Sequence, residues 1–133
     1  MSEEFIAQIN AEWAAKQVEI RGKVIEVATY LSTTVIDRSP VLSGRFAGNW
    51  NASIGVPDPH TSAAVDPHKG ATKTRAKNKL REYAAYVKYP PIYLSNALPY
   101  ANRLENGWSR KAPNGVVAVS MANTAMKFRG VVL

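Results

Sequence analysis

Apolar residues recur at three- and four-residue steps along the N-terminal part of the chain, the spacing of one face of an α-helix. The stripe consists of Ile6, Ile9, Trp13, Ile20, Val24, Val27 and Leu31. Ser2 can cap the first turn, and the acidic residues after it favour the positive end of the helix dipole. The pattern predicts one helix over about 3–36, about 50 Å long, which exceeds the width of a small domain. We therefore expect one end to pack on a partner, or the helix to kink near Gly22.

Shorter patterns follow in the rest of the chain. Apolar residues at even positions over 46–56 predict a strand, and residues 57–70 are expected to form a loop. A second helix is predicted over about 74–88, with an apolar face made of Ala76, Leu80, Tyr83, Ala84 and Val87. Short strands are predicted over 92–96 and 116–121, with one or two helical turns between them that end at Gly107.

These elements predict a single α+β domain over residues 1–133. A long N-terminal helix is expected to pack on a small, mostly antiparallel sheet, with a second helix in the middle, long loops, and a variable loop and basic segment at about 57–81. The chain has no cysteine, which excludes disulfides and thiolate metal sites. The sequence has no apolar run of about 18 residues, and its acidic start argues against a secretory signal, so we expect no membrane partner.

Positive charge is concentrated in one segment, which we call the basic strip (69–81). The formal net charge of the chain is +7, and the strip contributes six basic residues and no acidic ones, so the remainder carries only +1 (7 − 6). The basic residues are Lys69, Lys73, Arg75, Lys77, Lys79 and Arg81. The strip predicts contact with a polyanion such as the nucleic-acid backbone, without base stacking because no aromatic residue is interleaved. The alternative is a solvated helix face.

The usual patterns of catalytic and metal sites have little support. Two Asp-Pro-His units, at 58–60 and 66–68, offer carboxylate and imidazole ligands, but a proline-rich loop does not preset their geometry. The chain lacks the Gly-x-Ser-x-Gly elbow and the common glycine-rich phosphate loops. We therefore expect no catalytic residues, no cofactor and no metal, although a metal site in this loop remains an alternative.

The segment 97–115 is dense in residues with special backbone or packing properties. Proline and glycine fix its turns, at Pro99, Gly107, Pro113 and Gly115. Tyr100, Leu104 and Trp108 offer apolar anchors, and Glu105 is expected to pair with a nearby Arg or Lys, namely Arg103, Arg110 or Lys111. Loops of this composition usually serve recognition or assembly, so the segment is expected to dock rather than to react.

Two stretches also resemble the neck and tail-completion proteins of long-tailed bacteriophages, also described as head–tail joining or minor tail proteins. These stretches are "SPVLSGRFAGNW" and "IYLSNALPYANRLENGWSRKAPNGVVAVS", in the order that the family shows after a long first helix. In the first motif the matching residues are Pro40, Val41, Ser43, Gly44, Arg45 and Trp50. In the second they are Asn96, Pro99, Tyr100, Ala101, Leu104, Glu105, Gly107, Ser109, Ala112, Pro113 and Gly115. The chain departs from the family at Val116-Val117, where Met-Val is frequent, and in its longer, more basic middle.

The resemblance implies a structural protein of the virion without enzymatic activity. Its subunits would form a ring, expected to be hexameric, that joins tail to head around the DNA channel, with other neck and tail proteins as partners and assembly in the host cytoplasm. The basic strip could then contact genomic DNA in the channel or an acidic neighbouring ring. The motif residues are expected to support the fold more than to touch partners. The alternative function is a free nucleic-acid-binding module that uses residues 69–81.

Overall fold

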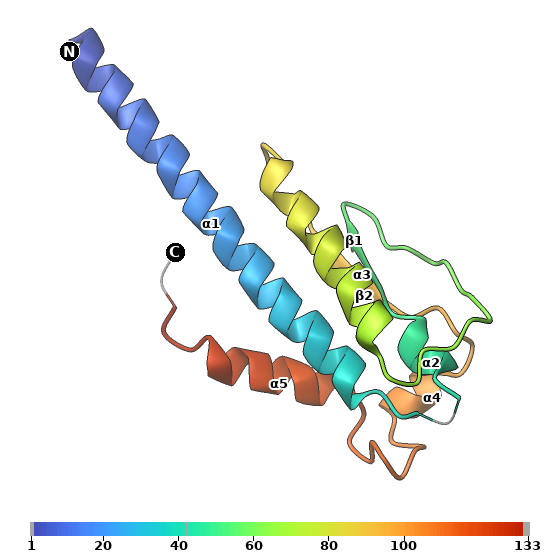
Figure 1. Ribbon diagram of the computed structural model, residues 1–133. Helices are drawn as coiled ribbons and strands as arrows, with labels where there is room; N and C mark the ends of the chain where they lie inside the picture. The colour runs from blue at the N-terminus through green and yellow to red at the C-terminus, as the bar shows by residue number, and fades with distance from the viewer. Residues whose placement is uncertain (1, 42, 132–133) are drawn as a thin grey trace.

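The computed structural model describes residues 2–41 and 43–131. Its most prominent element is the helix α1 (Glu3–Arg38), which extends well beyond the rest of the molecule at its N-terminal end (Figure 1). The Ser2 hydroxyl accepts a hydrogen bond from the Phe5 N–H at 3.2 Å and so caps the first turn. The helix runs without a break or a visible bend past Gly22 (Figure 1), so the kink, one of the two alternatives, is wrong.

The remaining elements form a compact body around the C-terminal half of α1. In chain order they are α2 (Arg45–Gly48), β1 (Asn51–Ile54), α3 (Gly70–Arg81), the 3₁₀ turn η1 (Glu82–Ala85), β2 (Ile92–Ser95), α4 (Ala101–Glu105) and α5 (Val117–Lys127). Strands β1 and β2 are antiparallel, with Asn51 opposite Ser95 and Ile54 opposite Ile92. The predicted α+β class is therefore confirmed, although within the described residues the sheet has only two strands.

Helices α3 and α5 both pack against α1, and in Figure 1 they lie on different sides of it. The core lies where α1, α3, β1 and the loop after β2 meet, and its buried apolar side chains include Val35, Ile36, Phe46, Trp50, Ala52, Ala76, Leu80, Leu98, Ala112 and Val116. Side chains of α1 before Arg21 contribute nothing to this core. Among the described residues no helix is long and apolar enough to cross a lipid bilayer.

The strand predicted over 46–56 is much shorter in the structure. Residues 45–48 form the helical turn α2, which buries Phe46, and pairing with β2 begins only at Asn51. Val56 is 71% exposed. The even-numbered periodicity failed because Phe46 and Trp50, four residues apart across a helical turn, bury their rings against each other with centroids 5.6 Å apart.

The second helix begins and ends earlier than predicted. It starts at Gly70 rather than near Thr74, because Asp66 accepts hydrogen bonds from the Lys69 and Thr72 N–H groups at its N-terminus. After Arg81 the chain tightens into η1. The buried residues agree with the prediction at Ala76, Leu80 and Tyr83, whereas Ala84 and Val87 are exposed.

The strand predicted over 116–121 is wrong, because these residues begin helix α5. Val116, Ser120 and Thr124 are buried at four-residue steps, so the helical period holds where the sequence suggested alternation. Beyond the helix, the Phe128 and Tyr30 rings meet edge-on with their centroids 5.7 Å apart, so the start of the apolar C-terminal tail (128–133) packs on α1. The last two residues of that tail, Val132 and Leu133, lie outside the described residues.

Candidate assembly site

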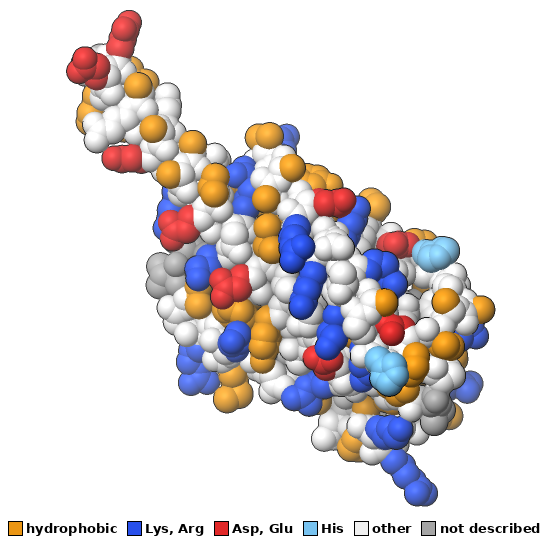
Figure 2. Space-filling model, viewed as in Figure 1, with side chains coloured by type: hydrophobic (Ala, Val, Ile, Leu, Met, Phe, Trp, Pro, Cys, Tyr) orange, Lys and Arg blue, Asp and Glu red, His pale blue; other side chains and the backbone are white. Residues whose placement is uncertain are grey.

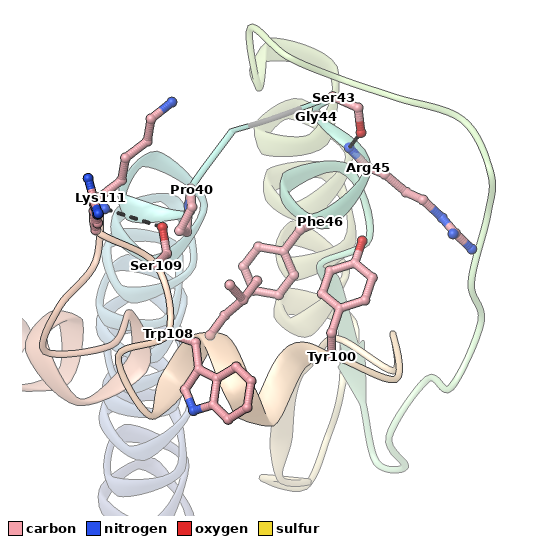
Figure 3. Close-up of a pocket in the computed structure, with 11 residues that line it drawn as sticks. Pro40, Ser43, Gly44, Arg45, Phe46, Tyr100, Trp108, Ser109 and Lys111 are labelled. Carbon is pink, nitrogen blue, oxygen red and sulfur yellow. Dashed lines mark hydrogen bonds between the residues drawn. The ribbon is translucent and has the colours of Figure 1, made fainter.

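The two motif segments meet at one end of the molecule and enclose a pocket of about 430 Å³. Its lining comes from the turn after α1 and from the segment around α4: Pro40, Ser43, Gly44, Arg45, Phe46, Tyr100, Leu104, Trp108, Ser109, Arg110 and Lys111. Figure 3 shows Ser43 and Gly44 on one side of this pocket and Trp108 on the other. The structure thus brings together residues of two motifs that lie about 50 positions apart in the sequence.

The first motif closes the end of α1. The Trp50 indole N–H donates to the Ser39 hydroxyl at 2.7 Å, and that hydroxyl donates to the Val35 carbonyl at 2.8 Å, all within the buried core. Pro40 is buried beside them, as is Gly44, whose carbonyl accepts from the Asp66 N–H at 3.0 Å. These bonds join the end of α1 to the first motif.

Asn49, absent from the predicted site residues, fixes the long loop to this motif. Its amide nitrogen donates to the carbonyls of Arg45 (2.6 Å) and Ser62 (3.0 Å), and its amide oxygen accepts from the Ser62 N–H at 2.7 Å. Arg45 adds a bond from Nε to the Ser62 carbonyl at 3.3 Å, and its side chain points away from the pocket (Figure 3). The sequence shows only an Asn between Gly48 and Trp50, and its burial and its bonds to the loop become visible in the structure.

The second motif is joined to the first by Asn96. Its amide nitrogen donates to the Phe46 carbonyl at 2.9 Å, a contact between residues 50 positions apart in the chain. The Tyr100 and Phe46 rings lie 6.2 Å apart at the pocket wall, and Leu104 packs against the core beside them. The Asn96 amide and the Tyr100 ring therefore both join the second segment to Phe46 of the first.

Glu105 caps helix α5 instead of forming the expected ion pair. Its Oε1 accepts from the Val116 N–H at 2.8 Å and the Val117 N–H at 2.7 Å, and its Oε2 accepts from the Ala118 N–H at 3.1 Å. Burial raises the pKa of the carboxyl, but the three backbone bonds outweigh it, so the pKa of Glu105 lies below its usual value. The carboxylate also faces the positive end of the α5 dipole.

The remaining residues of the second motif shape the turns around this cap. Gly107 and Gly115 adopt φ values of 84° and 80°, and a Cβ at Gly115 would collide with Glu105. A Cβ at Gly107 would collide with the Pro113 carbonyl. Ala112 is buried, Ser109 is half-buried, and Pro99 and Pro113 are exposed at the surface, while Ala101 begins α4.

The rim of the pocket is aromatic and basic. Trp108 is 71% exposed, and the Arg103 guanidinium lies over the Trp108 ring, 5.0 Å from the ring centroid. Lys111 donates from Nζ to the Val41 carbonyl at 2.9 Å, and Arg110 is exposed beside it. The sequence singled out Trp108 as an anchor but named the three cations only as partners for Glu105, because it does not show that they lie around the pocket.

Three of the six basic residues of the strip bind acceptors on other segments of the same molecule. Lys69 donates from Nζ to the Asp37 and Ser39 carbonyls at 2.6 and 2.8 Å, which caps the C-terminal end of α1. Burial lowers the pKa of Lys69, opposed by Asp37 and reinforced by neighbouring lysines. Lys73 forms an ion pair with Asp37 at 2.9 Å, and Arg75 donates to the Gly48 and Trp50 carbonyls at 3.0 and 2.9 Å.

The other half of the strip faces solvent along α3. Lys77 is exposed, Lys79 pairs with Glu82 at 2.9 Å, and Arg81 donates to the Asn78 side chain at 3.2 Å. Figure 2 shows basic side chains following α3 on the visible face. A polyanion would meet these three residues first, whereas Lys69 and Arg75 would have to break bonds within the fold.

The two Asp-Pro-His units serve local structure. Asp58 accepts from the His60 N–H at 2.9 Å in a turn. Asp66 Oδ2 accepts a hydrogen bond from the Thr72 hydroxyl at 2.6 Å. This bond lowers the pKa of Asp66, as do the bonds from the Thr72 and Lys69 N–H groups and the charge of Arg75, whereas burial raises it; the net pKa lies below the usual value. Across the described ranges no cluster of three or more His, Asp or Glu side chains could hold a metal ion.

Comparisons with protein-family profiles, with curated proteins and with solved structures found no match to this chain.

Proposed function

We propose that the protein is a structural subunit of the neck of a long-tailed bacteriophage virion. It would act by assembly, forming a ring at the head-proximal end of the tail that joins tail to head around the DNA channel. The observation that carries the proposal is the convergence of the two motif segments. The Asn96–Phe46 bond and the shared pocket join segments whose separate resemblances point to the same family.

The exposed groups at this end support a role in assembly. Trp108 presents a large apolar surface next to three cationic side chains, a combination that is enriched in protein interfaces. An acidic partner with an apolar side chain for the pocket would match both features. In the neck, that partner would be an adjacent ring protein or a neighbouring subunit.

Quantitative mass spectrometry of purified phage particles tests this proposal. The number to measure is copies of this chain per particle, relative to the tail-tube protein. A small fixed count, at or near a multiple of six, is the expected result, and phage lacking the gene should accumulate unjoined heads and tails in electron micrographs. Absence of the chain from the particle would refute the proposal.

A second candidate is a free nucleic-acid-binding module, favoured by the three solvent-facing cations of α3. Anisotropy of labelled duplex DNA would then show binding by the isolated protein with a salt slope of about −3, since each neutralised phosphate contributes about −0.9. The double variant Lys77→Gln/Arg81→Gln should reduce the slope by about 2, whereas Lys16→Gln/Lys23→Gln on α1 should leave it unchanged. Lack of binding by the isolated protein at low salt would remove this candidate and leave the neck proposal standing.

A further inference from the structure

The first 18 residues of α1, here called the N-terminal arm (3–20), contain no buried side chain, and only Lys16, Gln17 and Ile20, at the end nearer the body, are half-buried among the described residues. The large apolar side chains of the arm are about half exposed: Phe5 49%, Ile6 44%, Ile9 46% and Trp13 57%. Figures 1 and 2 show the N-terminal part of the arm projecting from the body as a bare helix, with apolar side chains along it and acidic ones at its tip. Exposed apolar surface of this extent usually marks an interaction site.

The body carries an apolar groove that no described residue fills. It has a volume of about 490 Å³ and is lined by Val24, Val27 and Leu31 of α1, with Ile92, Phe128 and Val131 from β2 and the C-terminal segment. Val131 is 43% exposed. Lys23 also lines the groove, and the Lys127 Nζ lies 5.8 Å from the ring centroid of the lining residue Phe128.

The arm and the groove match in spacing and in charge. Ile6, Ile9 and Trp13 have the same spacing along the helix as the groove residues Val24, Val27 and Leu31. Each lies 18 residues, or about five helical turns, before its counterpart, so both sets occupy the same face of α1. The side chains of residues 1–20 carry a net charge of −3, and the rest of the chain therefore carries +10 (7 + 3). An acidic arm and a basic body attract one another between molecules.

The arm cannot reach the groove of its own molecule, because both belong to one unbroken helix. We propose that the N-terminal arm binds the apolar groove of a second copy of this chain, with Trp13 as its main anchor. This contact goes beyond the neck assignment and does not rest on it. If each arm lies on the next copy, the contact is head-to-tail and can close a ring; if two arms pair reciprocally, it closes a dimer.

Light scattering after size-exclusion chromatography, over a range of protein concentrations, tests the contact. The wild type should self-associate, and Trp13→Asp should weaken association by about 30-fold or more, as expected for an interface hot spot. Val18→Asp is the matched control, because Val18 is 68% exposed on the same arm but lies on the opposite side of the helix from Trp13. Equal association of wild type and Trp13→Asp would overturn the proposal.

Complementation separates a lost contact from a lost fold. Val27→Asp places a charge in the groove and should also abolish association, with an unchanged circular dichroism spectrum. Mixing it with Trp13→Asp supplies one intact arm and one intact groove, so a one-to-one dimer should form. If both variants are folded and the mixture stays monomeric, the proposal is wrong.

Cysteine cross-linking gives the direction, and it stays informative if Val27→Asp does not fold. The chain has no cysteine, so a short bismaleimide joins only introduced ones. If two copies pair reciprocally with antiparallel helices, a mixture of Trp13→Cys and Val24→Cys proteins should cross-link. If the contact is head-to-tail, a mixture of Ile6→Cys and Val24→Cys proteins should cross-link instead. Either product supports the proposal, and neither product at associating concentrations overturns it. The neck proposal is judged separately, on particles.

Discussion

The N-terminal arm and the base of the molecule, where the two motif segments meet, are held in opposite ways. Within the described residues the hydrogen bonds and ion pairs of the arm are all local: its helical bonds, its cap and exposed side-chain pairs such as Gln8–Glu12. The base is held by side chains that reach across the chain, such as Asn96 to the Phe46 carbonyl and Glu105 to the N-terminus of α5. The difference indicates that the base supplies the stability of the domain, whereas the arm is available for a partner.

One tryptophan from each region tests this division with the same substitution. Trp50 is 6% exposed and Trp13 is 57% exposed. Trp50→Ala should lower the free energy of unfolding by about 3–5 kcal/mol, because it leaves a cavity and removes the bond to Ser39. Trp13→Ala should change it by less than about 0.5 kcal/mol when the protein is monomeric. The measurement is urea unfolding at a concentration at which light scattering shows monomers.

A comparable loss of stability in both tryptophan variants would break the comparison. It would mean that the arm folds as part of the cooperative domain. A loss in Trp13→Ala that appears only at high concentration would instead report the intermolecular contact, since association stabilises the folded state by mass action.

The local patterns of the sequence predicted the arm better than the base. The stripe from Ile6 to Leu31 needs only helical periodicity, and the helix is where the stripe predicted it. The strand predicted at 116–121 is wrong because these residues begin helix α5. The side chain that caps this helix, Glu105, lies too far away in the sequence for a local pattern to include it. Sequence-based prediction sees neither such a cap nor the carbonyls that Lys69 and Arg75 bind, since those acceptors are brought close only by the fold.

The cap itself gives the next largest expected effect. Glu105→Gln removes the negative charge from three backbone N–H groups and should cost about 1–2 kcal/mol of the free energy of unfolding. Glu12→Gln on the arm, where the carboxylate accepts only from Gln8 at 3.4 Å, should cost less than about 0.5 kcal/mol. Chemical unfolding of both variants near neutral pH makes the comparison.

The Glu105 effect should also depend on pH in a defined direction. The pKa of Glu105 is lowered in the folded protein from an ordinary value of 4.5, so the folded state binds its proton less readily than the unfolded state. The stability that the carboxylate contributes is therefore complete above that ordinary value and is lost as pH falls through the folded pKa. The difference between wild type and Glu105→Gln should narrow over this acidic range, and a difference that is constant with pH would contradict the cap.

A smaller effect is expected where the base uses a lysine. Lys69→Met keeps the apolar stem but removes the bonds to the Asp37 and Ser39 carbonyls, which should cost about 1 kcal/mol. Lys16→Met on the arm loses only an exposed pair with Glu19 at 3.5 Å and should cost less than about 0.5 kcal/mol. Thermal unfolding of the two variants separates a structural lysine from a surface one. Equal melting temperatures would mean that the Lys69 bonds contribute nothing measurable to the stability of the base.

The junction between arm and body gives the smallest effect and the sharpest boundary. Gly22 follows the buried Arg21, and a Cβ there meets no atom within 4 Å, so Gly22→Ala adds helix propensity without a clash. If this turn folds with the body, the free energy of global unfolding should rise by about 0.5–1 kcal/mol. Ala14→Gly makes the reverse change within the arm, and hydrogen exchange should show faster local opening there with an unchanged global value. A global loss in Ala14→Gly would place the boundary nearer the N-terminus, and the arm available to a second copy would then be shorter than residues 3–20.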